Sequence, residues 1–193
     1  MLPAAAHAGW AESWSTIHQV MSKVHAITAD FVQKKNLKIL SRPLVSEGKF
    51  YYRTPGELRW EYLSPIKNIL LIHGDKVAKY AWSKNGFTQE EGPQLEATRI
   101  VMEQIVSWLK GNFHDNKAFI PELKQGNPAT IVLTPAKDYL ANFIKRITLT
   151  LSNTDGVISS IEILEPQGSS TIIEFSHISL NTDIPNIKFE KLK

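Results

Sequence analysis

The chain has 193 residues, 42% of them hydrophobic, with 22 basic side chains against 19 acidic ones and no cysteine. This length suits one domain, no stretch approaches the roughly 20 apolar residues of a membrane-spanning helix, and the lack of cysteine excludes disulfides, thiolate metal sites and thiol nucleophiles. The sequence pI of about 9.0 gives a weak attraction to anionic surfaces, not the concentrated basic footprint of a protein that binds nucleic acid.

The N-terminus resembles the end of an export signal. Its first eight residues end in Ala6-His7-Ala8, the A-x-A pattern of a signal-peptidase site, but they are too short for a complete signal and lack a basic segment. We interpret residues 1–8 as the remnant of an export signal and residues 9–193 as one mature domain. A small-residue N-terminus without a targeting role is the alternative.

The first part of the chain changes from a helical to a strand period. Apolar residues three or four apart predict a helix over residues 10–25, with one stripe formed by Trp14, Ile17, Met21 and Val24. Alternation with period two then predicts strands over residues 29–40, 45–53, 58–63, 68–73, 77–83 and 87–91. Turn residues such as Pro55-Gly56 separate these strands.

The pair of strands at residues 47–65 has the most distinctive pattern. Large apolar side chains at Phe50, Tyr52, Leu58, Trp60 and Tyr62 alternate there with Lys49, Tyr51, Arg53, Arg59 and Glu61. We expect the first set to share one face of the sheet and Arg59 to lie on the exposed face. The apolar set either lines a cavity or belongs to one dry core, and most large apolar residues are core residues.

A second helix is predicted at residues 93–110. Leu95, Val101, Ile105 and Leu109 follow one side of it, and Ile100, Val106 and Trp108 widen the apolar surface. Gly111 is placed to end this helix. We expect Val101, Ile105 and Leu109 to face the apolar side of the sheet, so that the helix acts as a lid.

A second series of strands follows the central helix. Alternating patterns predict strands over residues 118–123, 130–134, 144–152, 157–164, 170–180 and 187–191. Many short strands with only two helices indicate a mainly β (α+β) protein with about eleven or twelve strands, arranged as a sandwich or barrel. No linker or repeat divides the chain, which favours a single domain.

No catalytic or metal-binding pattern is evident. The six histidines are scattered, and no carboxylate joins them at the spacing of a metal site. No phosphate-binding loop, dinucleotide-binding motif or serine nucleophile elbow occurs. We therefore predict no metal, no cofactor and no enzymatic activity, although a triad assembled from distant positions would escape such a search.

Four segments together resemble a known family. They are residues 31–33 (FVQ), residues 48–65 with GKFYY and PGELRWEYLSP, residues 72–76 (IHGDK) and residues 133–135 (LTP). These segments resemble the LolA-like family of periplasmic outer-membrane lipoprotein carriers, and the resemblance runs from about residue 14 to residue 192. The central block is the most specific of the four.

The resemblance implies a fold and a function. The fold is an incomplete antiparallel β-barrel of about eleven strands, with an N-terminal helix and a central helical lid over an apolar cavity. The function is that of a periplasmic carrier and chaperone for outer-membrane biogenesis. It would take acylated lipoproteins or lipids from an inner-membrane ABC transporter to an outer-membrane acceptor, as a monomer. The alternative is an envelope accessory factor or enzyme that acts on a lipid-linked substrate, such as a glycolipid or pigment.

One turn departs from the family pattern. The family often has arginine before the turn proline, and that arginine is tied to lid closure and cargo release, whereas Thr54 precedes Pro55 here. Arg53 lies one residue earlier, and one step along a strand reverses the side of the sheet. Arg53 and Arg59 are the candidates for polar control of the lid. The departure leaves open a divergent paralogue that carries another lipid.

Overall fold

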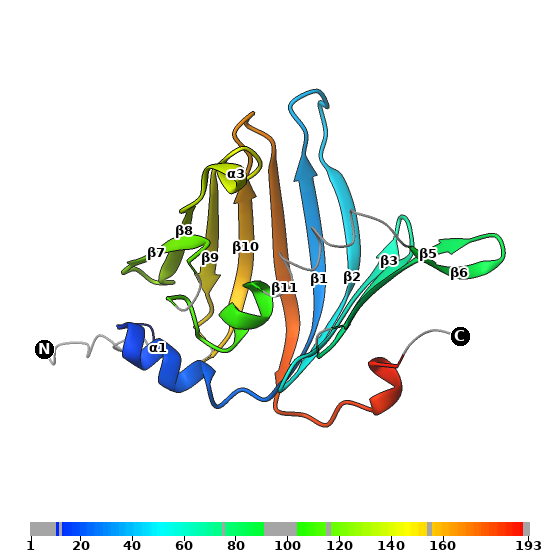
Figure 1. Ribbon diagram of the computed structural model, residues 1–193, viewed down its shortest axis with the longest axis horizontal. Coiled ribbons are helices and arrows are strands. Elements are labelled where there is room, and N and C mark those ends of the chain that lie inside the picture. Colours follow the sequence, from blue (N-terminus) through cyan, green and yellow to red (C-terminus); the bar gives the residue numbers. More distant parts are fainter. Residues whose placement is uncertain are drawn as a thin grey trace, which may run out of the picture.

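Eleven antiparallel strands form one continuous sheet in the part of the chain that the computed structural model describes, residues 11, 13–74, 76–90, 104–114, 117–153 and 156–190 (Figure 1). The strands are β1 (Ala26–Asn36), β2 (Leu44–Arg53), β3 (Glu57–Ser64), β4 (Asn68–His73), β5 (Lys76–Ser83), β6 (Gly86–Glu90), β7 (Phe119–Lys124), β8 (Thr130–Pro135), β9 (Arg146–Leu151), β10 (Ile158–Leu164) and β11 (Ser170–Leu180). The sheet is curved but open, because its edge strands β6 and β7 do not pair with each other. The expected mainly-β, incompletely closed architecture is confirmed.

The order of the strands explains why a segment must cross one face of the sheet. The order is β6-β5-β4-β3-β2-β1-β11-β10-β9-β8-β7, so consecutive strands are neighbours except at the step from β6 to β7. These two strands lie at opposite edges, and the connection between them spans the width of the sheet. Its described part includes a helix at residues 104–109.

The pairing register places the apolar residues of neighbouring strands on one face. Phe50 pairs with Ala29 on β1 and with Trp60 on β3, and Tyr52 pairs with Leu58. Directly paired residues in an antiparallel sheet point to the same side. We call this side the inner face. The opposite side, which carries Arg53 and every second residue before it on β2, is the outer face.

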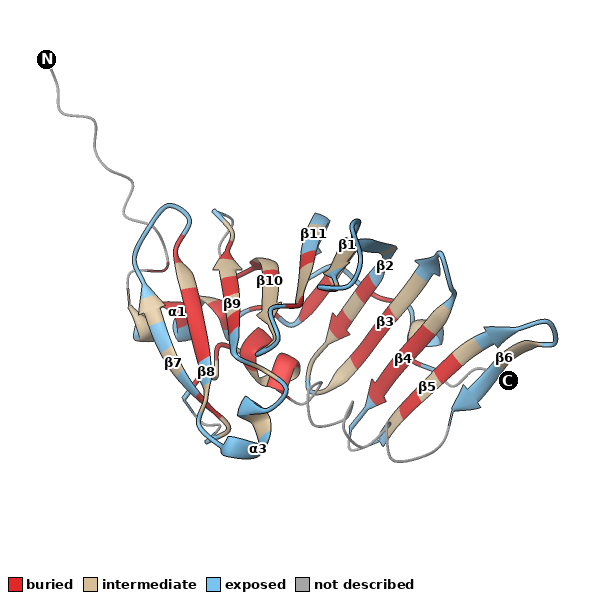
Figure 2. Ribbon diagram, turned by 90° about the horizontal axis from the view of Figure 1, so that it is seen from above, coloured by how far each residue is buried: buried red, intermediate tan, exposed pale blue. Residues whose placement is uncertain are grey.

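Two helices cover the inner face. Helix α1 (Trp14–Met21) begins at Ser13, whose hydroxyl accepts a hydrogen bond from the Thr16 amide at 3.2 Å. Ile17 and Met21 of α1 join the same apolar cluster as the sheet residues. Figure 2 shows how buried positions run along β3, β4 and β8, while exposed positions gather in the edge strand β6. No helix among the described residues is both long and apolar enough to cross a membrane.

The sequence-based prediction is wrong for the last strand. Residues 187–191 were expected to be extended, but Asn186–Lys188 form the 3₁₀ helix η1. Ile184 and Phe189 of this segment pack with Ala26 and with Tyr51 on the outer face. Apolar residues two positions apart are typical of a strand. In this segment, packing against the outer face buries Ile184 and Phe189 instead. The short helix α3 (Asp138–Ala141) was also not expected.

Other predicted boundaries shift by a few residues. The first helix is shorter than the predicted residues 10–25, and the first strand begins at Ala26 rather than at residue 29. Most of the predicted helix at residues 93–110 lies outside the described residues, but residues 104–109 are helical. Gly111 follows them with φ +76, as expected for a residue that ends a helix.

Gly48 is required by a close approach between strands. The β2–β3 register shifts between Glu47 and Gly48, and the Phe31 ring lies over the glycine. A Cβ at this position would lie 2.0 Å from the Glu61 carbonyl oxygen and 2.5 Å from the Phe31 ring. Only glycine fits without moving the backbone of β3.

We expect Gly48→Ala to lower the free energy of unfolding by about 3 kcal/mol, the upper part of the usual range for overpacking, because a backbone atom cannot rotate away. Urea denaturation of the purified variant measures this change. Gly56→Ala is the matched control, since a Cβ there meets no atom within 4 Å. Equal stability of the two variants would contradict the close approach.

Candidate functional site

The five apolar residues predicted to share a face lie together. Phe50, Tyr52, Leu58 and Trp60 are at most 2% exposed, and Tyr62 packs against the same cluster with partial exposure. Of the three predicted lid residues, Ile105 and Leu109 belong to this cluster, whereas Val101 lies outside the described residues. The structure therefore brings the predicted sheet and lid residues into one apolar layer, and their role toward a ligand stays a prediction.

A small apolar cavity lies between the sheet and the helix at residues 104–109. Its volume is about 20 Å³, room for about one water molecule. Its walls are apolar side chains from both layers, namely Ile27, Ala29, Phe50, Trp60, Val157, Ile158, Ile161, Phe175 and Ile178 on one side and Ile105, Trp108 and Leu109 on the other. Tyr52, Leu58 and Tyr62 belong to the same apolar cluster but do not line the cavity.

Aromatic rings form the sheet side of the cavity. Phe50 lies edge-on to Trp60 and to Phe175, with ring centroids 5.3 and 5.6 Å apart. Trp60 also contacts Phe31 at 5.2 Å. These distances are within the range of favourable aromatic contacts. Phe175 was not among the predicted wall residues, although its alternation with Ile173 along one strand is a signal that would have found it.

The helix at residues 104–109 is fixed at its C-terminal end. The Lys110 ammonium donates a hydrogen bond to the Pro55 carbonyl oxygen at 2.6 Å, and Trp108 packs edge-on against Phe119 at 5.8 Å. A Cβ on Gly111 would lie 3.1 Å from the His18 Cα of α1. The end of the helix is thus held by the β2–β3 turn, by β7 and by α1. With the helix in this position, the space between the two layers has room for about one water molecule.

Two tyrosine hydroxyls of the apolar cluster are protonated at physiological pH. Burial raises the pKa of Tyr52 and of Tyr62 to about 12, because the charged phenolate is poorly solvated there. The Tyr62 hydroxyl donates a hydrogen bond to the Gln33 side-chain oxygen at 2.9 Å. The inner face therefore carries no charge from these groups, which suits an apolar ligand.

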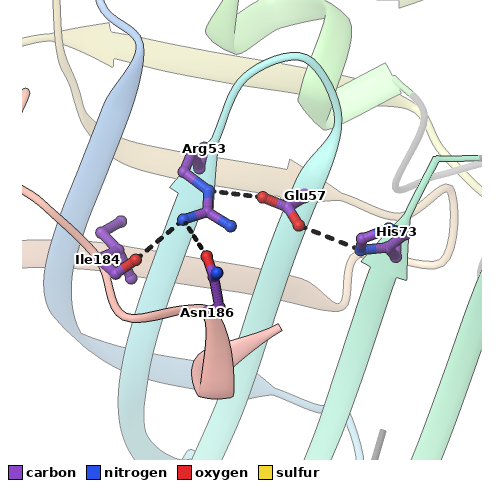
Figure 3. Close-up of polar contacts among 5 residues, drawn as sticks. All are labelled: Arg53, Glu57, His73, Ile184 and Asn186. Atoms are coloured by element: carbon purple, nitrogen blue, oxygen red, sulfur yellow. Dashed lines mark hydrogen bonds and ion pairs between the residues drawn. The ribbon is translucent and has the colours of Figure 1, made fainter. Parts of the chain in front are cut away.

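Arg53 and Arg59 point to the outer face and contact the C-terminal segment, residues 184–189. Figure 3 shows the contacts of Arg53. Arg53 bonds the Glu57 carboxylate at 2.5 Å, the Ile184 carbonyl at 2.9 Å and the Asn186 side-chain oxygen at 3.0 Å. Arg59 was expected to be exposed, but it is only 7% exposed because the C-terminal segment covers it. The alternating pattern predicted the side of the sheet correctly, but it could not predict that the C-terminal segment lies over Arg59.

Through these hydrogen bonds, Arg53 holds the C-terminal segment against the outer face. We expect Arg53→Ala to raise the hydrogen-exchange rates of the amides in η1 roughly tenfold, since two bonds from a charged donor are lost. Hydrogen exchange read by mass spectrometry measures this effect. Lys34→Ala removes a surface ion pair with Glu174 and should leave η1 protected. If the η1 amides of Arg53→Ala exchange as slowly as those of the wild-type protein, Arg53 does not hold the C-terminal segment.

Metal-ligating side chains do not converge in the described part of the chain. No group of three or more histidine or carboxylate side chains there could hold a metal ion. Polar side chains there instead form ion pairs, such as that of Asp30 with Lys49 at 2.8 Å on the outer face. The Lys49 ammonium hydrogen-bonds to Asp30 and lowers the pKa of that carboxyl group.

Known proteins share this sequence pattern and fold. The family model described as "Outer membrane lipoprotein carrier protein LolA" matches residues 22–191. Outer-membrane lipoprotein carrier proteins of Dechloromonas aromatica and of Francisella tularensis subsp. novicida are each 24% identical to this chain. Their alignments cover 98% and 94% of this chain, and 86% and 84% of the respective relatives.

The fold also resembles that of solved structures. An uncharacterised conserved protein from Thermus thermophilus superposes with a TM-score of 0.55 at 10% identity, over 92% of this chain and 90% of that one. At such low identity this similarity concerns the fold alone. The family match, by contrast, covers all eleven strands of the sheet and the segment between β6 and β7. This chain belongs to the LolA family of outer membrane lipoprotein carrier proteins.

Proposed function

We propose that this protein is a periplasmic carrier that keeps the acyl chains of lipoproteins or related lipids out of water during transfer from the inner to the outer membrane. The observation that carries the proposal is the cavity between the inner face and residues 104–109, whose walls are entirely apolar side chains. Family membership and the carrier names of the relatives support it. The protein performs no chemistry on its cargo in this proposal.

Cargo binding requires the helix at residues 104–109 to leave the sheet, because a cavity of about 20 Å³ cannot hold an acyl chain. Ile105, Trp108 and Leu109 then lose their contacts with the inner face, and the acyl chain replaces them there. Burial of an acyl chain contributes about 0.8 kcal/mol per methylene, so a chain of about fifteen methylenes gains roughly 12 kcal/mol. The apolar contacts between the helix and the inner face, which are lost when cargo binds, offset part of this gain. The cargo can therefore be released again.

The cellular path follows from the same proposal. The protein is exported, with mature residues 9–193 after cleavage behind Ala8. It receives cargo from an inner-membrane ABC transporter, crosses the periplasm as a monomer and delivers to an outer-membrane acceptor. Apolar contacts are non-directional, so the cavity accepts acyl chains of differing length. Extraction of protein purified from its native host, followed by lipid mass spectrometry, identifies the cargo.

Titration of delipidated protein with a fluorescent fatty-acid analogue tests the cavity itself. We expect Phe175→Glu to weaken binding about 100-fold, because a carboxylate in an apolar site costs about 2.5–3.5 kcal/mol. Phe175 is half-buried, so the variant should still fold. Trp82→Glu, at an exposed aromatic position on β5, is the matched control. Failure of the wild-type protein to bind any amphiphile would refute the carrier function.

A further inference from the structure

One end of the sheet gathers most of the exposed apolar side chains. Four of its connections are residues 37–43 between β1 and β2, 65–67 between β3 and β4, 136–145 with α3, and 165–169 between β10 and β11. We call these four connections the loop rim. Of the eleven large apolar side chains that are exposed among the described residues, eight lie in the rim or at the adjoining strand ends, namely Ile39, Leu40, Leu44, Val45, Leu63, Ile66, Tyr139 and Phe143.

The four connections form a continuous edge. The Lys38 amide lies 3.5 Å from the Ser169 hydroxyl, and the Lys145 amide donates to the Leu164 carbonyl at 2.7 Å. Ser64, at the end of β3, pairs with Glu47 near the start of β2. Figure 1 shows the β1–β2 loop, the β10–β11 turn and α3 at the same, upper end of the sheet. The rim spans eight adjacent strands from β4 to β8, a width of about 34 Å at ~4.8 Å per strand spacing.

The rim also holds the net positive charge of the protein. It contains the five basic residues Lys38, Arg42, Lys67, Lys137 and Lys145 but only Asp138 and Glu165 as acids, an excess of three positive charges. The formal charge of the whole chain is +3, so the remainder is neutral. None of the five basic side chains forms an ion pair within the described structure.

Basic and apolar residues alternate closely at the tips. Ile39 is 89% exposed and follows Lys38, Ile66 is 70% exposed and precedes Lys67, and Phe143 is 72% exposed two residues before Lys145. Separate tips, each with an apolar residue beside a cation, can insert shallowly among lipid headgroups while the cations contact phosphates. A protein interface would instead gather its apolar residues into one packed patch with few charges at its centre.

We propose that the loop rim is a docking surface for an anionic phospholipid membrane. Bound in this way, the protein stands with its strands directed toward the bilayer. The docking surface is separate from the apolar cavity, and none of the rim tips lines that cavity. Membrane docking therefore does not depend on whether the cavity carries an acyl chain.

Flotation of the full-length protein with lipid vesicles tests this proposal. Wild-type protein should bind vesicles containing about one third phosphatidylglycerol and bind phosphatidylcholine vesicles weakly. It should dissociate from the anionic vesicles as added salt screens the attraction between the basic residues and the lipid phosphates. Lys38→Gln with Arg42→Gln should reduce partitioning about 30-fold, from about 1 kcal/mol per basic residue near an anionic surface. Ile39→Ser with Leu40→Ser should weaken binding to both kinds of vesicle.

Matched controls lie away from the rim. Lys23→Gln and Ile187→Ser remove an exposed cation and an exposed apolar side chain elsewhere and should partition like wild type. All rim variants should retain wild-type affinity for the fatty-acid analogue, which separates this result from a failure of the carrier function. Absence of wild-type binding to anionic vesicles, or rim residues that bind only a protein partner, would overturn the proposal.

Discussion

Trp60→Ala should lower the free energy of unfolding by about 3–5 kcal/mol, as expected when a large aromatic core residue is truncated. The Trp60 side chain is 2% exposed and contacts the rings of Phe31, Phe50 and Phe175. Its loss removes apolar burial and leaves a hole that the curved sheet can fill only by moving strands. Because typical domains are stable by only about 5–15 kcal/mol, this change is a large fraction of the total.

Guanidinium denaturation of Trp60→Ala and Trp82→Ala provides the measurement and its control. Trp82 is 51% exposed and packs on Phe87 with ring centroids 4.9 Å apart. We expect its removal to cost about 1 kcal/mol or less, the contribution of one surface aromatic pair. Should the two variants unfold at the same denaturant concentration, Trp60 would not be the centre of the inner-face core.

Leu109→Ala should accelerate binding of the fatty-acid analogue. Leu109 lines the cavity from the lid side and is buried against the sheet, and truncating a buried leucine costs at least about 2 kcal/mol. In the carrier proposal this cost falls on the closed position of the helix, so the open population increases about 30-fold. Stopped-flow fluorescence with the analogue in excess measures the association rate.

Leu70→Ala is the matched control for the lid. Leu70 belongs to the same apolar cluster but sits on β4 and does not line the cavity. Its truncation should reduce global stability without changing the association rate. If Leu109→Ala binds the analogue no faster than wild type, the helix at residues 104–109 is not the gate of the cavity.

The two faces of the sheet have different tasks in this proposal. The inner face buries large apolar side chains under helices that can separate from it, whereas the outer face uses Arg53 and Arg59 to hold the C-terminal segment. The β2–β3 turn meets both, because Lys110 bonds to Pro55 and Arg53 bonds to Glu57. The position where the family often has arginine, Thr54, lies within this turn.

The assignment of residues to one face of the sheet follows from the amino-acid pattern alone. Phe50 and Trp60 alternate with Tyr51 and Arg59. Because successive side chains of a strand point to opposite sides, residues are assigned to a face correctly whichever strands pair with them. The pattern also predicted most turns and the helix end at Gly111, whose positive φ suits glycine. These are local properties, set by backbone geometry within a few residues.

The cover over each face, by contrast, depends on contacts between distant parts of the chain. Arg53 meets Ile184 across 131 positions, and no local pattern encodes such a contact. Ile187 and Phe189 have the spacing of a strand, yet the segment folds as η1 because the outer face offers Tyr51 and Ala26 for packing. The small apolar cavity, too, depends on how the helix at residues 104–109 meets the sheet, since free volume arises where distant surfaces are brought into contact.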